Sequence, residues 1–287
     1  MPCPCKATLP VSFDDKSQRM IFTYTFFQNA LMGALLASVL CAIIGTYIVT
    51  RRLVIVGGGM AHASLGGVGL GAYFGFSPLL GAALFSVLTG FGIRHLSGNR
   101  SVREDSAIAM LWTFGMSIGI LFAYLAPGFY TDLPAYLFGN ILSISHTDLL
   151  ILGLLTGVTL LLYTVFRDTI ISVASDRNFA RTQGIPVNFI ENLLTVFIAL
   201  TIVGCLHLMG IVMVISLLSV PQMTAALFVH TYRHMVWLSA FFGFSGCMGG
   251  LALSYYADVP GGAAIILLSI SFYALCRLGK YCYGRFV

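Results

Sequence analysis

The chain has 287 residues, of which 58% are hydrophobic and 9% are charged, and its formal net charge is +5. Soluble domains contain about 25% charged residues, so this composition excludes a soluble globular protein and indicates a polytopic membrane protein. The basic residues are dispersed between apolar segments rather than clustered, which argues against a nucleic-acid-binding protein. We therefore expect an all-α polytopic membrane helical bundle of 8–9 transmembrane helices with no soluble domain attached.

The polar start of the chain differs from everything that follows. Residues 1–20 contain prolines and charges but no apolar h-region, so a cleaved signal peptide is not expected. Met20 directly precedes the apolar run, and residues 1–20 are interpreted as a polar extension that is either disordered or upstream of the native start. The membrane domain is expected to cover residues 21–278, and residues 279–287 to form a basic cytoplasmic tail.

Long charge-free runs predict the membrane spans, because a helix needs about 20 apolar residues to cross the hydrocarbon core. Only Gly210 separates the sixth run from the seventh, so these two are either separate crossings or one interrupted segment. The candidate spans are 22–49, 54–74, 78–93, 107–127, 149–166, 192–209, 211–229, 235–255 and 262–276.

Arginines and lysines indicate the orientation, because they collect in cytoplasmic loops. If nine spans cross the membrane, every basic residue after residue 20 falls on one side, which places the C-terminus in the cytoplasm and the N-terminus outside. The intervening loops 75–77, 128–148 and 256–261 contain no lysine or arginine. The basic residues concerned are Arg51, Arg52, Arg94, Arg100, Arg103, Arg167, Arg177, Arg181, Arg233, Arg277, Lys280 and Arg285.

His62 is the most unusual residue of the second span. No Asp, Glu, Lys or Arg occurs from Leu53 to Ile93, so Tyr73 is the only other titratable side chain in that stretch. An ionisable group at this depth is energetically costly and is a candidate functional site. The alternative is a histidine that hydrogen-bonds a neighbouring helix and contributes only to packing.

Small residues surround His62 at helical spacing. Gly58 and Gly66 lie four residues to either side of His62 and are expected to leave clearance for its imidazole. An adjacent ridge of small residues is expected to let a neighbouring helix approach closely. The residues of this ridge are Gly59, Ala63, Gly67 and Gly71.

Two carboxylates, Glu104 and Asp105, begin the fourth span on the side predicted to be cytoplasmic. Carboxylates there interact favourably with the positive end of the helix dipole, so helix capping is the expected role. A cytoplasmic exit site for a cation is the alternative.

The segment 168–188 is the longest polar connection between two well-defined spans. Asp176 can cap a short helix in it, Phe179 and Ala180 give that helix an apolar side, and Gly184 is expected to end it. Such a helix could dock into a groove of a soluble partner, or it could lie on the lipid headgroups as an amphipathic loop helix.

Six blocks of sequence, in order along the chain, resemble the permease subunits of bacterial ABC importers for zinc and manganese. The first has the pattern G-x-x-x-A-H-A-x-x-G-G around His62, and the resemblance covers about residues 21–278. The other blocks contain Arg103–Ile108, Tyr136–Leu142, Asp176–Ile185, Gly210–Ala225 and Leu253–Ala263.

The resemblance implies a homodimeric, multi-pass permease of the bacterial inner membrane, with a metal path between or within its subunits. ATP would bind a separate ATPase subunit, in agreement with the lack of a G-x-x-x-x-G-K-[ST] loop in this chain. An extracytoplasmic metal-binding protein would deliver the ion, and no cofactor would be bound permanently. The coupling segment that contacts the ATPase would include Asp176, Phe179, Ala180, Gly184 and Ile185.

One departure from the family concerns the metal ligands. Many relatives carry an Asp four residues before the histidine, where this chain has Gly58. Asp258 is a candidate ligand, with a turn-forming role before Pro260 as its alternative. His207 is a further candidate for which packing is the preferred interpretation. Imidazole and carboxylate ligands favour zinc, manganese or iron(II) over magnesium or calcium.

A proton-coupled secondary transporter that acts through His62 without an ATPase is the rival hypothesis. An intramembrane hydrolase has little support, because the sequence contains no H-E-x-x-H, no G-x-S-x-G and no pair of intramembrane aspartates.

Overall fold

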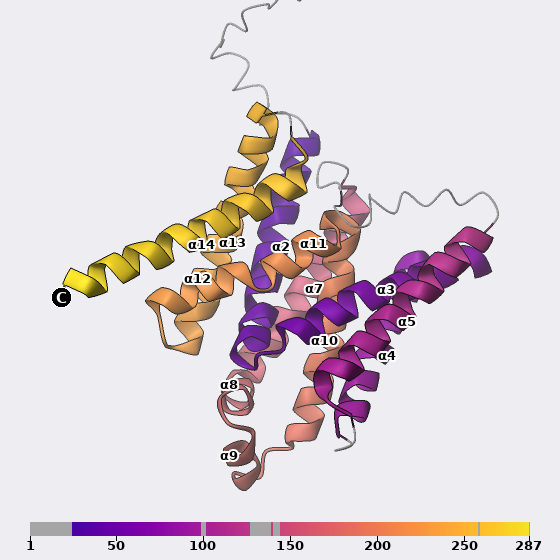
Figure 1. Ribbon diagram of the computed structural model, residues 1–287, viewed down its shortest axis with the longest axis horizontal. Helices are drawn as coiled ribbons and strands as arrows, with labels where there is room; N and C mark the ends of the chain where they lie inside the picture. The colour runs from indigo at the N-terminus through magenta and orange to yellow at the C-terminus, as the bar shows by residue number, and fades with distance from the viewer. Residues whose placement is uncertain (1–24, 99–101, 127–138, 140–143, 258, 287) are drawn as a thin grey trace, which may run out of the picture.

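The computed structural model describes residues 25–98, 102–126, 139, 144–257 and 259–286, and every regular element in these ranges is a helix (Figure 1). The all-α membrane fold expected from the composition is confirmed, while the predicted extension at residues 1–20 lies outside these ranges. The helices are α2 (Thr25–Thr50), α3 (Val54–Phe74), α4 (Pro78–Gly98), α5 (Glu104–Leu125), α7 (His146–Val165), α8 (Arg167–Ser175), α9 (Arg177–Thr182), α10 (Val187–Met209), α11 (Ile211–Leu217), α12 (Val220–Phe228), α13 (Tyr232–Ala257) and α14 (Gly261–Phe286).

Nine segments of the described chain are long and apolar enough to cross a membrane, which is the upper of the two predicted counts. The sixth and seventh are separate, because Gly210 has a φ of 76° and ends α10 there. The sixth begins at Val187, before the predicted residue 192, and so contains the charged residue Glu191. The last helix, α14, continues through residue 278 to Phe286, so the predicted tail begins within this helix.

The seventh span consists of two short helices, α11 and α12, with an interruption between Leu217 and Val220. Gln222 is buried beside the interruption, and its Nε2 donates hydrogen bonds to the carbonyl oxygens of Leu217 (3.0 Å) and Cys41 (2.8 Å). Backbone groups freed by a broken helix need such partners inside a membrane. The second bond also joins α12 to α2, where Gly45 leaves room for the amide, because a Cβ at that position would lie 2.8 Å from its Cδ.

The helices form two groups that α10 connects. On one flank α3 packs closely against both α4 and α5, and on the other α13 packs against α2 and α14 (Figure 1). The sixth span, α10, contacts α3 and α4 of the first group and α2 of the second. The two short helices α8 and α9 lie at the lower end of the view, beside the start of α10. A motion of α10 would therefore reach both groups.

Candidate functional site

His62 lies in α3 and is half-buried against Trp112 of the neighbouring helix α5. The two rings are stacked, with centroids 4.4 Å apart and an interplanar angle of 12°. Stacking fixes one face of the imidazole, so the ring can meet a ligand only through its edge or its other face.

The ring of Trp112 is itself held in place by a sulfur contact. Its indole Nε1 donates a hydrogen bond of 2.9 Å to Sδ of Met116, one turn further along α5. The Nδ1 atom of His62 is buried and has no hydrogen-bond partner among the residues that the structure describes. A neutral imidazole with a free nitrogen is a common ligand for first-row divalent metals.

The two glycines that flank His62 have different surroundings. A Cβ at Gly58 would meet only Ile215 Cδ1 of α11, at 3.9 Å, so position 58 has room for a Cβ. A Cβ at Gly66 would lie 2.8 Å from the carbonyl oxygen of Gly115 and 2.9 Å from the ring of Phe85. Gly66 therefore permits close packing on α5 and α4.

The small-residue ridge of α3 faces two helices in turn. Gly59 faces Ile108 of α5, whose Cγ2 would lie 2.7 Å from an added Cβ. Ala63 lies against Gly115 of the same helix, since a Cβ on Gly115 would come 2.6 Å from the Cα of Ala63. The second half of the ridge packs on α4 instead: Gly67 contacts Gly81 and Gly71 contacts Pro78.

Of the other candidate ligands, only Glu104 and Asp105 have side chains that the structure describes. Asp258 lies outside the described residues, and so does the side chain of His207. Glu104 and Asp105 are exposed at the start of α5, where Asp105 lies 3.9 Å from Arg103. No group of three or more His, Cys, Asp or Glu side chains able to hold a metal ion occurs within the described ranges.

The predicted coupling segment contains the short helix α9. Asp176 caps it, because its Oδ1 accepts hydrogen bonds from the backbone N–H groups of Asn178 (2.8 Å) and Phe179 (3.1 Å). Gly184 ends the segment with a φ of 78°. Ala180 is fully buried, whereas the side chain of Phe179 is 56% exposed and contributes apolar surface at this end of the molecule.

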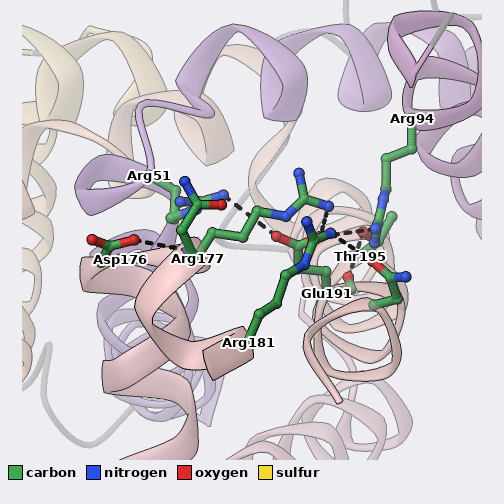
Figure 2. Close-up of polar contacts among 9 residues, drawn as sticks. Arg51, Arg94, Asp176, Arg177, Arg181, Glu191 and Thr195 are labelled. Carbon is green, nitrogen blue, oxygen red and sulfur yellow. Dashed lines mark hydrogen bonds and ion pairs between the residues drawn. The ribbon is translucent and has the colours of Figure 1, made fainter. Parts of the chain in front are cut away.

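A buried carboxylate that sequence reasoning missed lies beside α9. Glu191, in the second turn of α10, is only 8% exposed and receives three guanidinium groups (Figure 2). Arg177 of α9 and Arg94 of α4 donate to its Oε2, at 2.8 and 2.9 Å. Arg51, just after α2, lies 3.4 Å from its Oε1.

These four residues, which we call the Glu191 cluster, line a cavity of about 440 Å³. Glu104 also lines this cavity, so the carboxylate proposed from sequence as an exit site shares it with three arginines. The only indication of this site in the sequence was Glu191, an acidic residue directly before the charge-free run of the sixth span. The distribution of arginines predicted the orientation, but nothing in the sequence indicated that Arg51, Arg94 and Arg177 meet.

Comparisons with known proteins agree on one family. The model of the ABC-3 family, described as the ABC 3 transport family, matches residues 23–279. The manganese transport system membrane protein MntC of Halalkalibacterium halodurans is 35% identical over 256 residues, covering 89% of this chain and 87% of that protein. The manganese import system permease protein ScaB of Streptococcus gordonii is 30% identical over 246 residues, covering 86% of this chain and 88% of that protein.

Solved structures extend this likeness to the fold. A chain of PsaBC from Streptococcus pneumoniae in complex with Fab matches with a TM-score of 0.83 and 30% identity, covering 91% of this chain and 94% of that chain. A putative metal-chelate type ABC transporter in an inward-facing conformation matches with a TM-score of 0.67 at 17% identity, covering 94% and 91%. The second match concerns the fold alone.

Proposed function

The chain belongs to the ABC 3 transport family, and from this membership we propose that it is the permease subunit of an ATP-driven importer for a divalent transition metal. It is a multi-pass protein of the bacterial inner membrane. Relatives are named as manganese and iron transport proteins, which supports manganese or iron as the cargo. Zinc is kept as a third candidate, because imidazole and carboxylate ligands suit it equally well.

The observation that carries this proposal is the state of His62. Its half-buried imidazole lies in a helix without acidic or basic residues, and its Nδ1 has no partner among the described residues. Trp112 stacks on one face of the ring and orients it. We propose that His62 binds the metal transiently on its way through, with Asp258 as a second ligand outside.

Weak ligation suits a transporter better than a closed cage, because the ion must leave each site rapidly. His207, Glu104 and Asp105 are kept as subordinate candidates. Of these, Glu104 shares its cavity with three arginines, and their positive charge opposes the binding of a cation there.

The proposed partners follow from the other end of the molecule. We propose that the segment Asp176–Ile185 docks into a separate ATPase subunit, with Phe179 inserted and Ala180 and Ile185 joining the segment to the membrane helices. The exposure of Phe179 and the burial of Ala180 support this division. The complete importer would consist of two copies of the permease in the lipid bilayer, two ATPase subunits and an extracytoplasmic metal-binding protein.

Replacement of His62 by alanine tests the role of this residue. In cells that depend on this importer, we expect His62→Ala to reduce manganese uptake about tenfold or more, because loss of one ligand group lowers metal affinity by at least that factor. The amount of protein in the membrane should be unchanged. Uptake of radioactive manganese per amount of permease measures both quantities.

His95→Ala is the matched control, since His95 is an exposed histidine near the end of α4. It should leave uptake unchanged, and normal uptake by His62→Ala would refute the metal-binding role.

The rival secondary transporter is tested with the chain alone in liposomes. Manganese uptake driven there by a pH gradient, without an ATPase, would overturn the ABC importer proposal.

A further inference from the structure

The Glu191 cluster connects the short helix α9 to the membrane helices through charge. Three guanidinium groups from separate elements, α9, α4 and the end of α2, meet on one carboxylate of α10 (Figure 2). Within the described ranges, Arg177 is the only residue of α9 that forms an ion pair with a membrane-spanning helix. The cluster is thus the electrostatic attachment of α9.

The burial of Glu191 makes this attachment specific. Glu191 is only 8% exposed, so its charge is compensated by the three guanidinium groups rather than by water. Exposed ion pairs of this chain, such as that between Arg103 and Asp105, lack this property. A displacement of Arg177 would therefore change the ion pairing of a carboxylate that has little access to water.

We propose that Glu191 is a positioning residue for transport, which passes the movement of α9 to the helices around His62. The inference rests on the proposed function and deepens it, because it names the link between the ATPase-docking segment and the metal path. Arg177 is the connection on the side of α9, and Arg51 and Arg94 are the connections to α2 and α4.

A continuous series of contacts leads from Glu191 to the helix of His62. Thr195, one turn further along α10, donates its Oγ1 hydrogen to the backbone carbonyl of Glu191 at 2.8 Å. Thr195 and Met60 both pack against Gly90 of α4. A Cβ added to Gly90 would lie 2.7 Å from Cγ2 of Thr195 and 2.8 Å from Cε of Met60. Met60 precedes His62 by two residues in α3, so α10, α4 and α3 meet at this point.

The test uses Arg177→Gln, which releases α9 but leaves the ion pairs of Glu191 with Arg51 and Arg94 in place. The permease is purified as a complex with its ATPase subunit and reconstituted in liposomes with the metal-delivery protein. Manganese moved and ATP hydrolysed are measured in the same sample. The matched control is Arg103→Gln, which removes the same charge from an exposed site.

We expect Arg177→Gln to lower the manganese moved per ATP hydrolysed by about fivefold or more, while ATP hydrolysis continues. A factor of about five is the lower end of the coupling commonly found between two sites of one protein. Arg103→Gln should keep the wild-type ratio. A wild-type ratio in Arg177→Gln would overturn the proposal. So would a loss of transport and hydrolysis in equal proportion to lost complex, because that pattern indicates a purely structural role.

A double-mutant cycle with Glu191→Gln adds a second readout. If both residues act through one bond, the double variant should show a smaller effect on the ratio than the product of the single effects. Multiplicative effects would overturn the link between them. A wild-type complex that hydrolyses ATP but moves none of manganese, iron and zinc would instead refute the proposed function, which distinguishes the two failures.

Discussion

Position 58 lies one turn before His62 in α3, and the family resemblance leads us to expect an aspartate there. The structure leaves room there, since a Cβ at Gly58 would have only Ile215 within 4 Å. Packing therefore does not require glycine at this position. A carboxylate four residues before an imidazole shares its helix face, so the two could hold one ion together.

Gly58→Asp is expected to strengthen metal binding. A second ligand should lower the manganese concentration for half-maximal uptake by about tenfold, which corresponds to about 1.4 kcal/mol. Insertion of a charged residue into the span has a cost of its own, so the protein level should fall. The concentration dependence of uptake, normalised to permease in the membrane, measures the effect.

Gly58→Asn is the control, because it has nearly the same shape without the charge. If Asn and Asp variants show the same concentration dependence, the idea of a restored ligand is wrong.

The role of Trp112 could not be predicted from the sequence, because nothing in the sequence of α5 indicates which aromatic ring meets His62. A stack between two helices depends on their rotation, and hydropathy does not determine that rotation.

At the scale of elements, the glycines of α3 set the distances to α4 and α5. Gly67→Ala should destabilise the fold by about 1–3 kcal/mol, because its Cβ would lie 2.6 Å from the backbone nitrogen of Ala82 and neither helix can yield locally. The midpoint of thermal unfolding of the purified protein measures this loss. Uptake should decline with it.

Gly157→Ala in α7 is the matched control, since a Cβ at Gly157 would meet nothing within 4 Å. Its midpoint should stay the same or rise, because alanine favours a helix more than glycine does. Equal destabilisation by both substitutions would show that close approach to α4 is not what Gly67 provides.

The helices themselves could largely be predicted from hydropathy, and the errors have identifiable causes. The sixth span was predicted to start at residue 192 because a charge-free run cannot include Glu191. Three arginines, distant in sequence, stabilise that carboxylate inside the helix. The spacing of Gly67 and Gly71 indicated a packing face but could not assign it to α4, because a ridge does not identify its partner.

At the scale of the whole molecule, the Glu191 cluster bears on orientation. Arg51, Arg94 and Arg177 follow three different spans, and the prediction that they share one side agrees with their contact with one carboxylate. The nine candidate spans of the described residues would then place the end of α14 on the same side, which the distribution of basic residues predicts to be cytoplasmic.

Reporter fusions test this orientation. Green fluorescent protein fused after residue 287 should fluoresce, and alkaline phosphatase fused there should be inactive, because the phosphatase folds only outside the cytoplasm. Phosphatase inserted between α3 and α4 should be active. An active phosphatase at the C-terminus would contradict the orientation, and activity at both sites would also contradict the odd number of spans between them.

The excess of arginine over glutamate in the cavity has a consequence for an ion that has passed His62. The membrane voltage, negative inside, lowers the energy of a divalent cation by about 4.6 kcal/mol per 100 mV for a full crossing. The cavity acts against accumulation at the end of that crossing, because three guanidinium groups outnumber the carboxylates of Glu191 and Glu104 that line it. If the proposed path leads through this cavity, an ion driven inward by the voltage would gain no resting place there.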